Sequence, residues 1–166
     1  MITEVNVQIP FQLDYTRPAG LTVPVNGVAS VTFQLQPVQD NLHVLTTCDT
    51  ILGSPTPANQ GCAPLVTHAD GSPVAISTPA RNGEIVTIYA VGLGGLSTWQ
   101  SGTPSPNPPL GAGPLRITLD TGLNAGPSQP YCLSNCEIPP RVATFTGMTP
   151  GFVGLYQINV DRKSVV

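Results

Sequence analysis

Residues 85–91, Ile-Val-Thr-Ile-Tyr-Ala-Val, decide the fold class of this chain. The stretch is apolar on both faces of an extended strand, which is typical of a strand in the middle of a sheet. Asn82-Gly83 stands just before it, and Asn followed by Gly supplies the positive φ angles of a tight turn. We therefore predict that residues 85–91 form the most central strand of an all-β protein.

Further strands are predicted on both sides of this stretch, because apolar and polar residues alternate there as they do in half-buried strands. The alternating stretches are residues 5–13, 31–35, 115–119 and 156–160. Asn26-Gly27 and Asp70-Gly71 are further turn dipeptides, and sustained helical periodicity is absent from the sequence. Short strands separated by such turns predict an immunoglobulin-like β-sandwich.

The composition limits the classes of function. The 166 residues suffice for one domain, and the 17 Gly and 19 Pro favour long loops such as residues 97–114. Charged residues make up 9% of the chain, against roughly 25% in an average domain. Six basic residues and a net charge of −3 argue against a nucleic-acid partner. No apolar run reaches the roughly 20 residues of a membrane span.

Four cysteines form two local pairs. Cys48 and Cys62 bracket a Gly/Pro-rich loop, and Cys132 and Cys136 form a tight C-x3-C. In such a charge-poor chain we predict two disulfides, and hence an extracellular or cell-surface protein whose signal peptide lies upstream. The alternative is a four-cysteine zinc site, which usually has closer C-x2-C spacings. We expect neither a metal nor a cofactor.

His68, Asp70 and Ser72 together suggest a hydrolase. A catalytic triad, however, assembles side chains from distant segments, and no G-x-S-x-G elbow is present. We therefore interpret Asp70-Gly71 as a hairpin turn and His43 as a surface residue near a strand end. The prediction is that the chain is not an enzyme.

Trp99 is the candidate ligand-binding residue, with Tyr131 as its companion. Trp99 lies in a polar, Pro-rich loop, and exposed aromatic rings offer flat surfaces to sugars and to protein partners. The competing interpretation is that Trp99 caps one end of the sandwich core. Its exposure distinguishes the two.

Four motifs carry a family resemblance. They are Thr-Pro-Gly-Phe-Val-Gly-Leu-Tyr-Gln-Ile-Asn-Val at residues 149–160, residues 79–94, His-Ala-Asp-Gly-Ser at residues 68–72, and Val-Asn-Gly-Val-Ala-Ser at residues 25–30. Together they resemble the Solibacter-type uncharacterised C-terminal domain of large secreted proteins of acidobacteria. The resemblance implies an immunoglobulin-like fold related to IPT/TIG domains, used in tandem extracellular arrays. It implies no catalytic residues.

In such arrays residues 4–36 are similar to the closing strands of one module, and residues 80–160 to the opening strands of the next. We expect the N-terminal strands to complete the sheet of the C-terminal part, within one chain or in a strand-swapped homodimer. Residues 1–166 then form a single module. The alternative is closing strands at 1–45 and a second repeat at 66–166, linked by the 46–65 disulfide loop.

The predicted function is a non-catalytic structural or adhesion-type interaction module of a larger secreted or surface protein. Its partner is a protein or glycan at the cell surface. The alternative is an accessory carbohydrate-binding domain attached to a secreted enzyme.

Overall fold

The computed structural model describes residues 7–38, 41–49, 61–94, 99–112, 116–117 and 141–162. All regular elements in these ranges are β-strands. The described residues therefore include no helix that could cross a membrane. The strands are β1 (Ala19–Leu21), β2 (Pro24–Val25), β3 (Val28–Ala29), β4 (Phe33–Leu35), β5 (His43–Val44), β6 (Val66–Thr67), β7 (Glu84–Val91), β8 (Arg116–Ile117), β9 (Arg141–Val142), β10 (Phe145–Met148) and β11 (Tyr156–Arg162).

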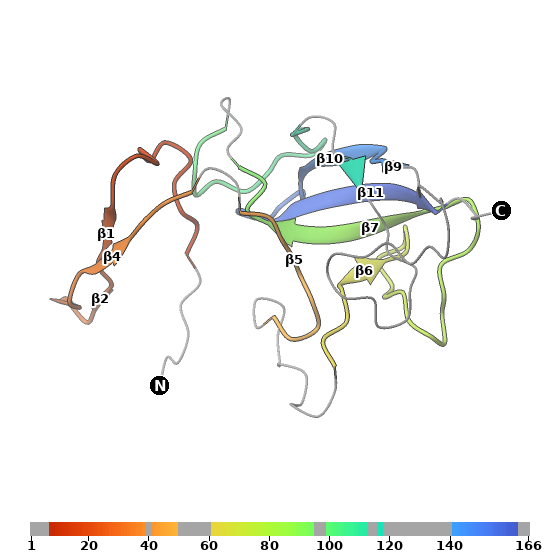
Figure 1. Cartoon of the computed structure of the whole chain (residues 1–166), viewed down its shortest axis with the longest axis horizontal. Coiled ribbons are helices and arrows are strands. Elements are labelled where there is room, and N and C mark those ends of the chain that lie inside the picture. The colour runs from red at the N-terminus through yellow and green to blue at the C-terminus, as the bar shows by residue number, and fades with distance from the viewer. Residues whose placement is uncertain are drawn as a thin grey trace, which may run out of the picture.

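A five-stranded antiparallel sheet forms the centre of the molecule (Figure 1). Its order is β10-β11-β7-β5, and β6 also pairs with β7. The long strand β7 therefore has β11 along one edge and both β5 and β6 along the other. This confirms that residues 85–91 form the most central strand.

The core lies on one face of this sheet. The cross-strand pairs Val86↔Val160, Ile88↔Ile158 and Ala90↔Tyr156 are all buried. They alternate along β7 and β11, as the period of a strand requires. Val66, Val74 and Leu93 are among the residues that pack against this cluster.

The opposite face of β7 is more exposed to solvent than its apolar sequence predicts. Ile85 is 46% exposed, and Thr87, Tyr89 and Val91 are half-buried. The hydroxyl of Thr87 lies 3.2 Å from Oδ1 of Asn159 on the neighbouring strand β11, in hydrogen-bond contact. The run is apolar on both faces, but only one face is fully buried.

The second edge of β7 is shared by two segments that a disulfide joins. The amide of Leu45, just after β5, donates to the carbonyl of Tyr89, and the amide of Tyr89 donates to the carbonyl of Leu65, just before β6. Beyond this point the Cys48–Cys62 disulfide links the two segments, with a Cα–Cα distance of 5.3 Å. The predicted first disulfide is confirmed.

The N-terminal strands form a separate ribbon. β1 pairs with β4, and β2 pairs with β3 through the turn Asn26-Gly27, where both φ angles are positive. In Figure 1 this ribbon stands away from the five-stranded sheet. The expectation that residues 4–36 complete the sheet of residues 80–160 within one chain is therefore wrong for the residues described, whereas the strand-swapped homodimer stays a prediction. Local pairing closes a much shorter loop, and β5 and β6 occupy the edge of β7.

Residues 7–13 were also expected to be part of a strand, and this is wrong. The chain makes turns here, because the amide of Leu13 donates to the carbonyl of Pro10. Pro10 has no N–H to contribute to a sheet. Oδ1 of Asp14 accepts hydrogen bonds from both the amide and the hydroxyl of Thr16, which favours a turn over a strand.

The described residues thus form an all-β protein of several antiparallel sheets. Besides the five-stranded sheet, these are the ladders β1-β4, β2-β3 and β8-β9. The finer immunoglobulin-like sandwich topology stays a prediction.

Candidate functional site

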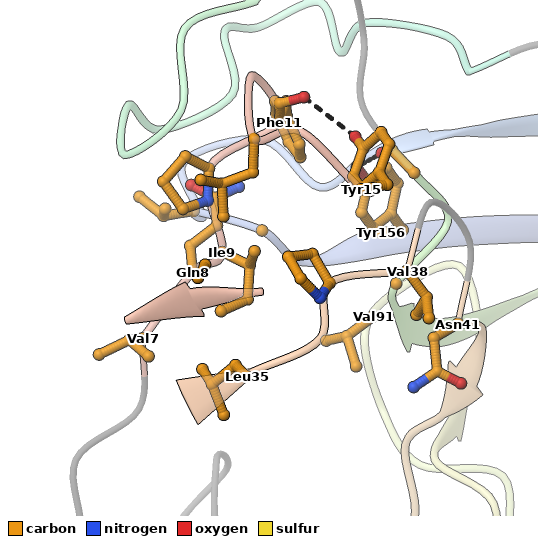
Figure 2. A pocket seen from close by; sticks show the side chains of 18 of the residues that line it. Val7, Gln8, Ile9, Phe11, Tyr15, Leu35, Val38, Asn41, Val91 and Tyr156 are labelled. Atoms are coloured by element: carbon orange, nitrogen blue, oxygen red, sulfur yellow. Dashed lines mark hydrogen bonds between the residues drawn. The ribbon is translucent and has the colours of Figure 1, made fainter. Parts of the chain in front are cut away.

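An apolar groove of about 660 Å³ lies where the N-terminal segment meets the five-stranded sheet (Figure 2). Residues 7–11, Leu13 and Tyr15 form one wall, and the base of the ribbon with residues 36–38 and Asn41 forms another. The end of β7 and the start of β11 contribute Val91 and Tyr156. Among the described residues that line the groove, none carries a charged side chain, although Gln8, Gln36 and Asn41 bring amides.

Two of these amides, and the tyrosine hydroxyls, are engaged within the protein. The Nε2 of Gln36 donates to the carbonyl of Tyr15 at 2.8 Å, and Oε1 of Gln8 accepts from the amide of Gly102 at 2.6 Å. The hydroxyl of Tyr15 donates to the carbonyl of Phe11, and that of Tyr156 donates to the carbonyl of Gly94. These bonds hold the walls together and leave mainly hydrocarbon surface toward the groove.

Gly92 positions one wall of the groove. Its φ of +78° is in the region that favours glycine, and a Cβ built on it would collide with the carbonyl group of Asn41. Without a side chain at this position, the amide of Asn41 reaches the carbonyl of Gly92 at 2.9 Å. The close approach fixes Asn41 beside the end of β7.

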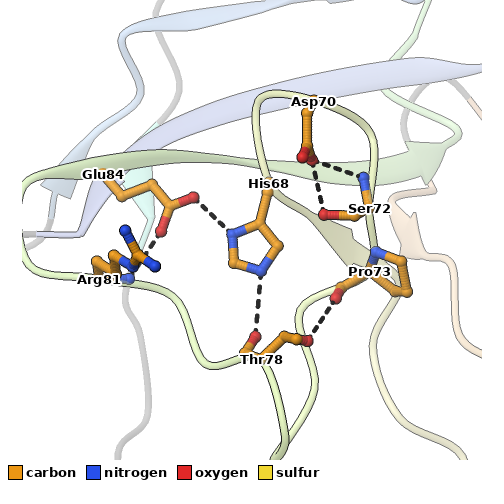
Figure 3. A network of polar contacts seen from close by, with 7 residues as sticks. All are labelled: His68, Asp70, Ser72, Pro73, Thr78, Arg81 and Glu84. Atoms are coloured by element: carbon orange, nitrogen blue, oxygen red, sulfur yellow. Dashed lines mark hydrogen bonds and ion pairs between the residues drawn. The ribbon is translucent and has the colours of Figure 1, made fainter.

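His68, Asp70 and Ser72 do not form a triad. Oδ1 of Asp70 accepts from the amide and the hydroxyl of Ser72, which lowers the pKa of Asp70 and makes the predicted turn (Figure 3). The imidazole of His68 instead contacts Oε1 of Glu84 through Nδ1 at 2.5 Å, and the carbonyl of Thr78 through Nε2 at 3.1 Å.

The His68 contacts favour the protonated imidazole. Both partners accept hydrogen bonds, so both ring nitrogens must donate, and only the imidazolium has two N–H groups. The hydrogen bond to Glu84 accordingly raises the pKa of His68. The amide of Arg81, together with His68, lowers the pKa of Glu84. This network ties the loop after β6 to the start of β7.

Trp99 is half-buried, so it is neither a fully exposed binding residue nor a buried cap of the core. Its indole N–H donates to the carbonyl of Thr103 in the same loop, at 3.1 Å. That loop also contacts the N-terminal wall of the groove, because the hydroxyl of Ser101 accepts from the amide of Phe11. Trp99 does not line the groove, but its loop contacts the N-terminal wall through Ser101 and Gly102.

The remaining predicted site residues are placed as follows. His43 is exposed on β5, and its Nε2 lies 3.0 Å from Oδ1 of Asp49. Tyr131, Cys132 and Cys136 fall outside the described residues, so the second disulfide stays a prediction. In the part of the chain that is described, no three His, Cys, Asp or Glu side chains group to hold a metal ion.

The groove was not predicted from the sequence. Its lining comes from residues 7–15, 35–38, 91–94 and 153–156 together with Ala19 and Asn41, which are brought together by tertiary contacts. One local feature could have indicated it. Pro10 interrupts the apparent strand, so residues 7–13 could be irregular and leave their apolar side chains exposed.

The chain was compared with known proteins at three levels. No protein-family model, curated protein or solved structure shows a significant match to it. The function is therefore argued from the geometry of the groove.

Proposed function

We propose that this protein is a non-catalytic, extracellular interaction module whose groove binds a short, uncharged, apolar segment of a partner protein. The observation that carries the proposal is the groove itself, about 660 Å³ in volume, in which the described lining residues carry no charged side chain. Sites of this size with apolar walls and few polar groups are typical of ligand binding. Because no lining residue is charged, a charged ligand would lose its hydration without gaining an ion pair.

Exposure of the groove walls supports this proposal. Val7, Ile9 and Val38 are all exposed although they line a concave surface. An apolar segment seated there would remove these side chains from water, at roughly 25 cal/mol for each Å² buried. The Cys48–Cys62 disulfide supports an oxidising compartment.

A protein segment fits better than a sugar, which is the alternative. Sugar binding needs aromatic faces together with free hydrogen-bonding groups, whereas the indole N–H of Trp99 and the side chains of Gln8 and Gln36 already bond within the protein. The immunoglobulin-like sandwich and the place in a tandem array, both expected from the family resemblance, agree with a binding module.

The proposal is tested by NMR titration of the ¹⁵N-labelled chain with two uncharged probes, an end-capped octapeptide of alternating Val and Thr, and cellohexaose. We expect the peptide to shift the amide signals of residues 7–9, Phe11 and residues 91–94, and the sugar to leave them unchanged. The variant Ile9→Asp should weaken peptide binding at least tenfold, since one buried aliphatic side chain is worth about 1.5–3 kcal/mol. Ile76→Asp, a fully exposed isoleucine outside the groove, is the matched control.

Two outcomes would overturn the proposal. One is a peptide that shifts no groove signal, or that binds Ile9→Asp and Ile76→Asp equally well. The other is binding of cellohexaose with shifts at Phe11 and Tyr15, which would replace the protein segment by a carbohydrate.

A further inference from the structure

The N-terminal ribbon has a face that the rest of the chain leaves exposed. In the β1–β4 register, Ala19 lies opposite Leu35 and Leu21 opposite Phe33, so these four side chains share one face. Gly20 and Gln34 point to the other face. The ribbon is therefore amphipathic, with a continuous apolar side.

This apolar face is incompletely buried. Phe33 is 51% exposed, Leu35 is also exposed, and Val31, two residues before Phe33, is exposed to a greater extent. A two-stranded ribbon is at best marginally stable in water unless a further strand or layer covers it. Among the residues described, neither β1 nor β4 pairs with a third strand. Outside the groove, the described residues therefore provide no covering layer for Leu21 and Phe33.

The charge distribution indicates what that layer is. Residues 18–39 contain no Asp, Glu, Lys or Arg. At the base of the ribbon, Arg17 forms an ion pair with Asp14 at 3.4 Å. Exposed edge strands normally carry charges that oppose pairing with a like strand, and this ribbon has none. An uncharged apolar face is complementary to itself, whereas a charged face would repel its copy.

We infer that the apolar face of the ribbon is a homodimer interface, on which the ribbon of a second copy of this chain packs face to face. A two-fold axis would bring each patch onto the same patch of its partner. Phe33 and Leu21 of each copy would then be buried in a four-stranded miniature sandwich. This interface adjoins the groove, because Ala19 and Leu35 at one end of the face also line the groove, whereas Leu21 and Phe33 do not.

The size of the face predicts a weak dimer. Each apolar side chain offers roughly 60–120 Å². With Val31 added to the four side chains of the face, five side chains on each copy bury about 600–1,200 Å² in total, no more than the low end of a standard stable interface at roughly 1,200 Å². We therefore expect a reversible dimer with a Kd between about 1 μM and 1 mM.

Sedimentation equilibrium of the full chain from 5 μM to 1 mM tests the inference. The weight-average mass of the wild type should rise toward twice that of the monomer, whereas Phe33→Asp should stay monomeric throughout. Phe152→Asp is the matched control, because Phe152 is 53% exposed and lies in the turn before β11, outside the ribbon. It should dimerise like the wild type.

Hydrogen exchange of the wild type gives a readout that does not depend on a variant. The amides of residues 19–21 and 33–35 should exchange at least fivefold more slowly at 1 mM than at 5 μM, and those of β7 should be unchanged. The inference is overturned by a wild type that is monomeric at 1 mM, by equal loss of association in both variants, or by growth beyond a dimer. Peptide binding in the groove is tested separately by repeating the NMR titration on Phe33→Asp, which is monomeric and keeps every residue that lines the groove.

Discussion

The substitution Ile158→Ala tests the assignment of the buried face of the sheet. Ile158, on β11, is 2% exposed. It pairs with Ile88 on the neighbouring strand β7 and with Thr146 on the other neighbour, β10. The change removes three carbons, worth about 0.8 kcal/mol each in transfer from water. The cavity left in a packed sheet adds to this, so we expect a loss of about 3–4 kcal/mol in the free energy of unfolding.

Ile85→Ala is the matched control on the same sheet. Ile85 lies on the opposite face of β7 and is 46% exposed, so its truncation removes half as much buried surface and leaves no closed cavity. We expect a loss of about 1 kcal/mol or less. The two variants should therefore differ by about 2–3 kcal/mol.

The assay is urea unfolding of the oxidised protein, followed by the fluorescence of Trp99, the single tryptophan. With an m-value of about 2 kcal/mol/M, Ile158→Ala should lower the midpoint by about 1.5–2 M, and the slope should not change. Equal losses in Ile158→Ala and Ile85→Ala, or a loss below about 1 kcal/mol in Ile158→Ala, would refute the assignment of the buried face.

Two further predictions concern the polar network and the groove. Because the folded pKa of His68 is raised, its interaction with Glu84 stabilises fully below the unfolded pKa near 6.5 and is lost as pH rises through the folded pKa. Between pH 6.5 and 9 the Tm of the wild type should fall more than that of His68→Gln; parallel curves would show that the contact contributes nothing. Gly92→Ala should destabilise more than Gly83→Ala, because both have positive φ but only Gly92 has a backbone carbonyl in the way. Chemical denaturation compares the two, and equal losses would mean that φ alone matters.

The strongest local patterns predicted the centre of the fold. The apolar run in β7 and the alternation in β11 are long enough to identify strands, and the pairing of Ile88 with Ile158 buries their shared face. Asn26-Gly27 was predicted as a turn because its backbone conformation is set by those two residues. The Cys48–Cys62 disulfide was predicted from the local pairing of the cysteines in a charge-poor chain, with a zinc site as the alternative.

The pairing of strands and the groove could not be predicted in the same way. Alternation in residues 7–13 resembled a strand, but the turn-forming contacts of Asp14 with Thr16, and the missing N–H of Pro10, favoured turns. Which strand pairs with β7 depends on competition between segments, and the two-residue strands β5 and β6 carry almost no periodic signal. The groove depends on that outcome, because its walls meet only after the sheet has formed.

The arrangement of strands around β7 also determines how the protein responds to mechanical tension. The chain enters the sheet through β5 beside Val91, at one end of β7, and β11 leaves it beside Glu84, at the other end. A pull between the ribbon and the end of β11 therefore acts along the strands, perpendicular to their hydrogen bonds. In this shear geometry the load crosses the two residue pairs between β5 and β7 and then the seven pairs between β7 and β11, and the pairs within each ladder bear it together instead of opening one after another. The β5–β7 pairing is the shorter of the two, so it would yield before the central pair of strands β7 and β11.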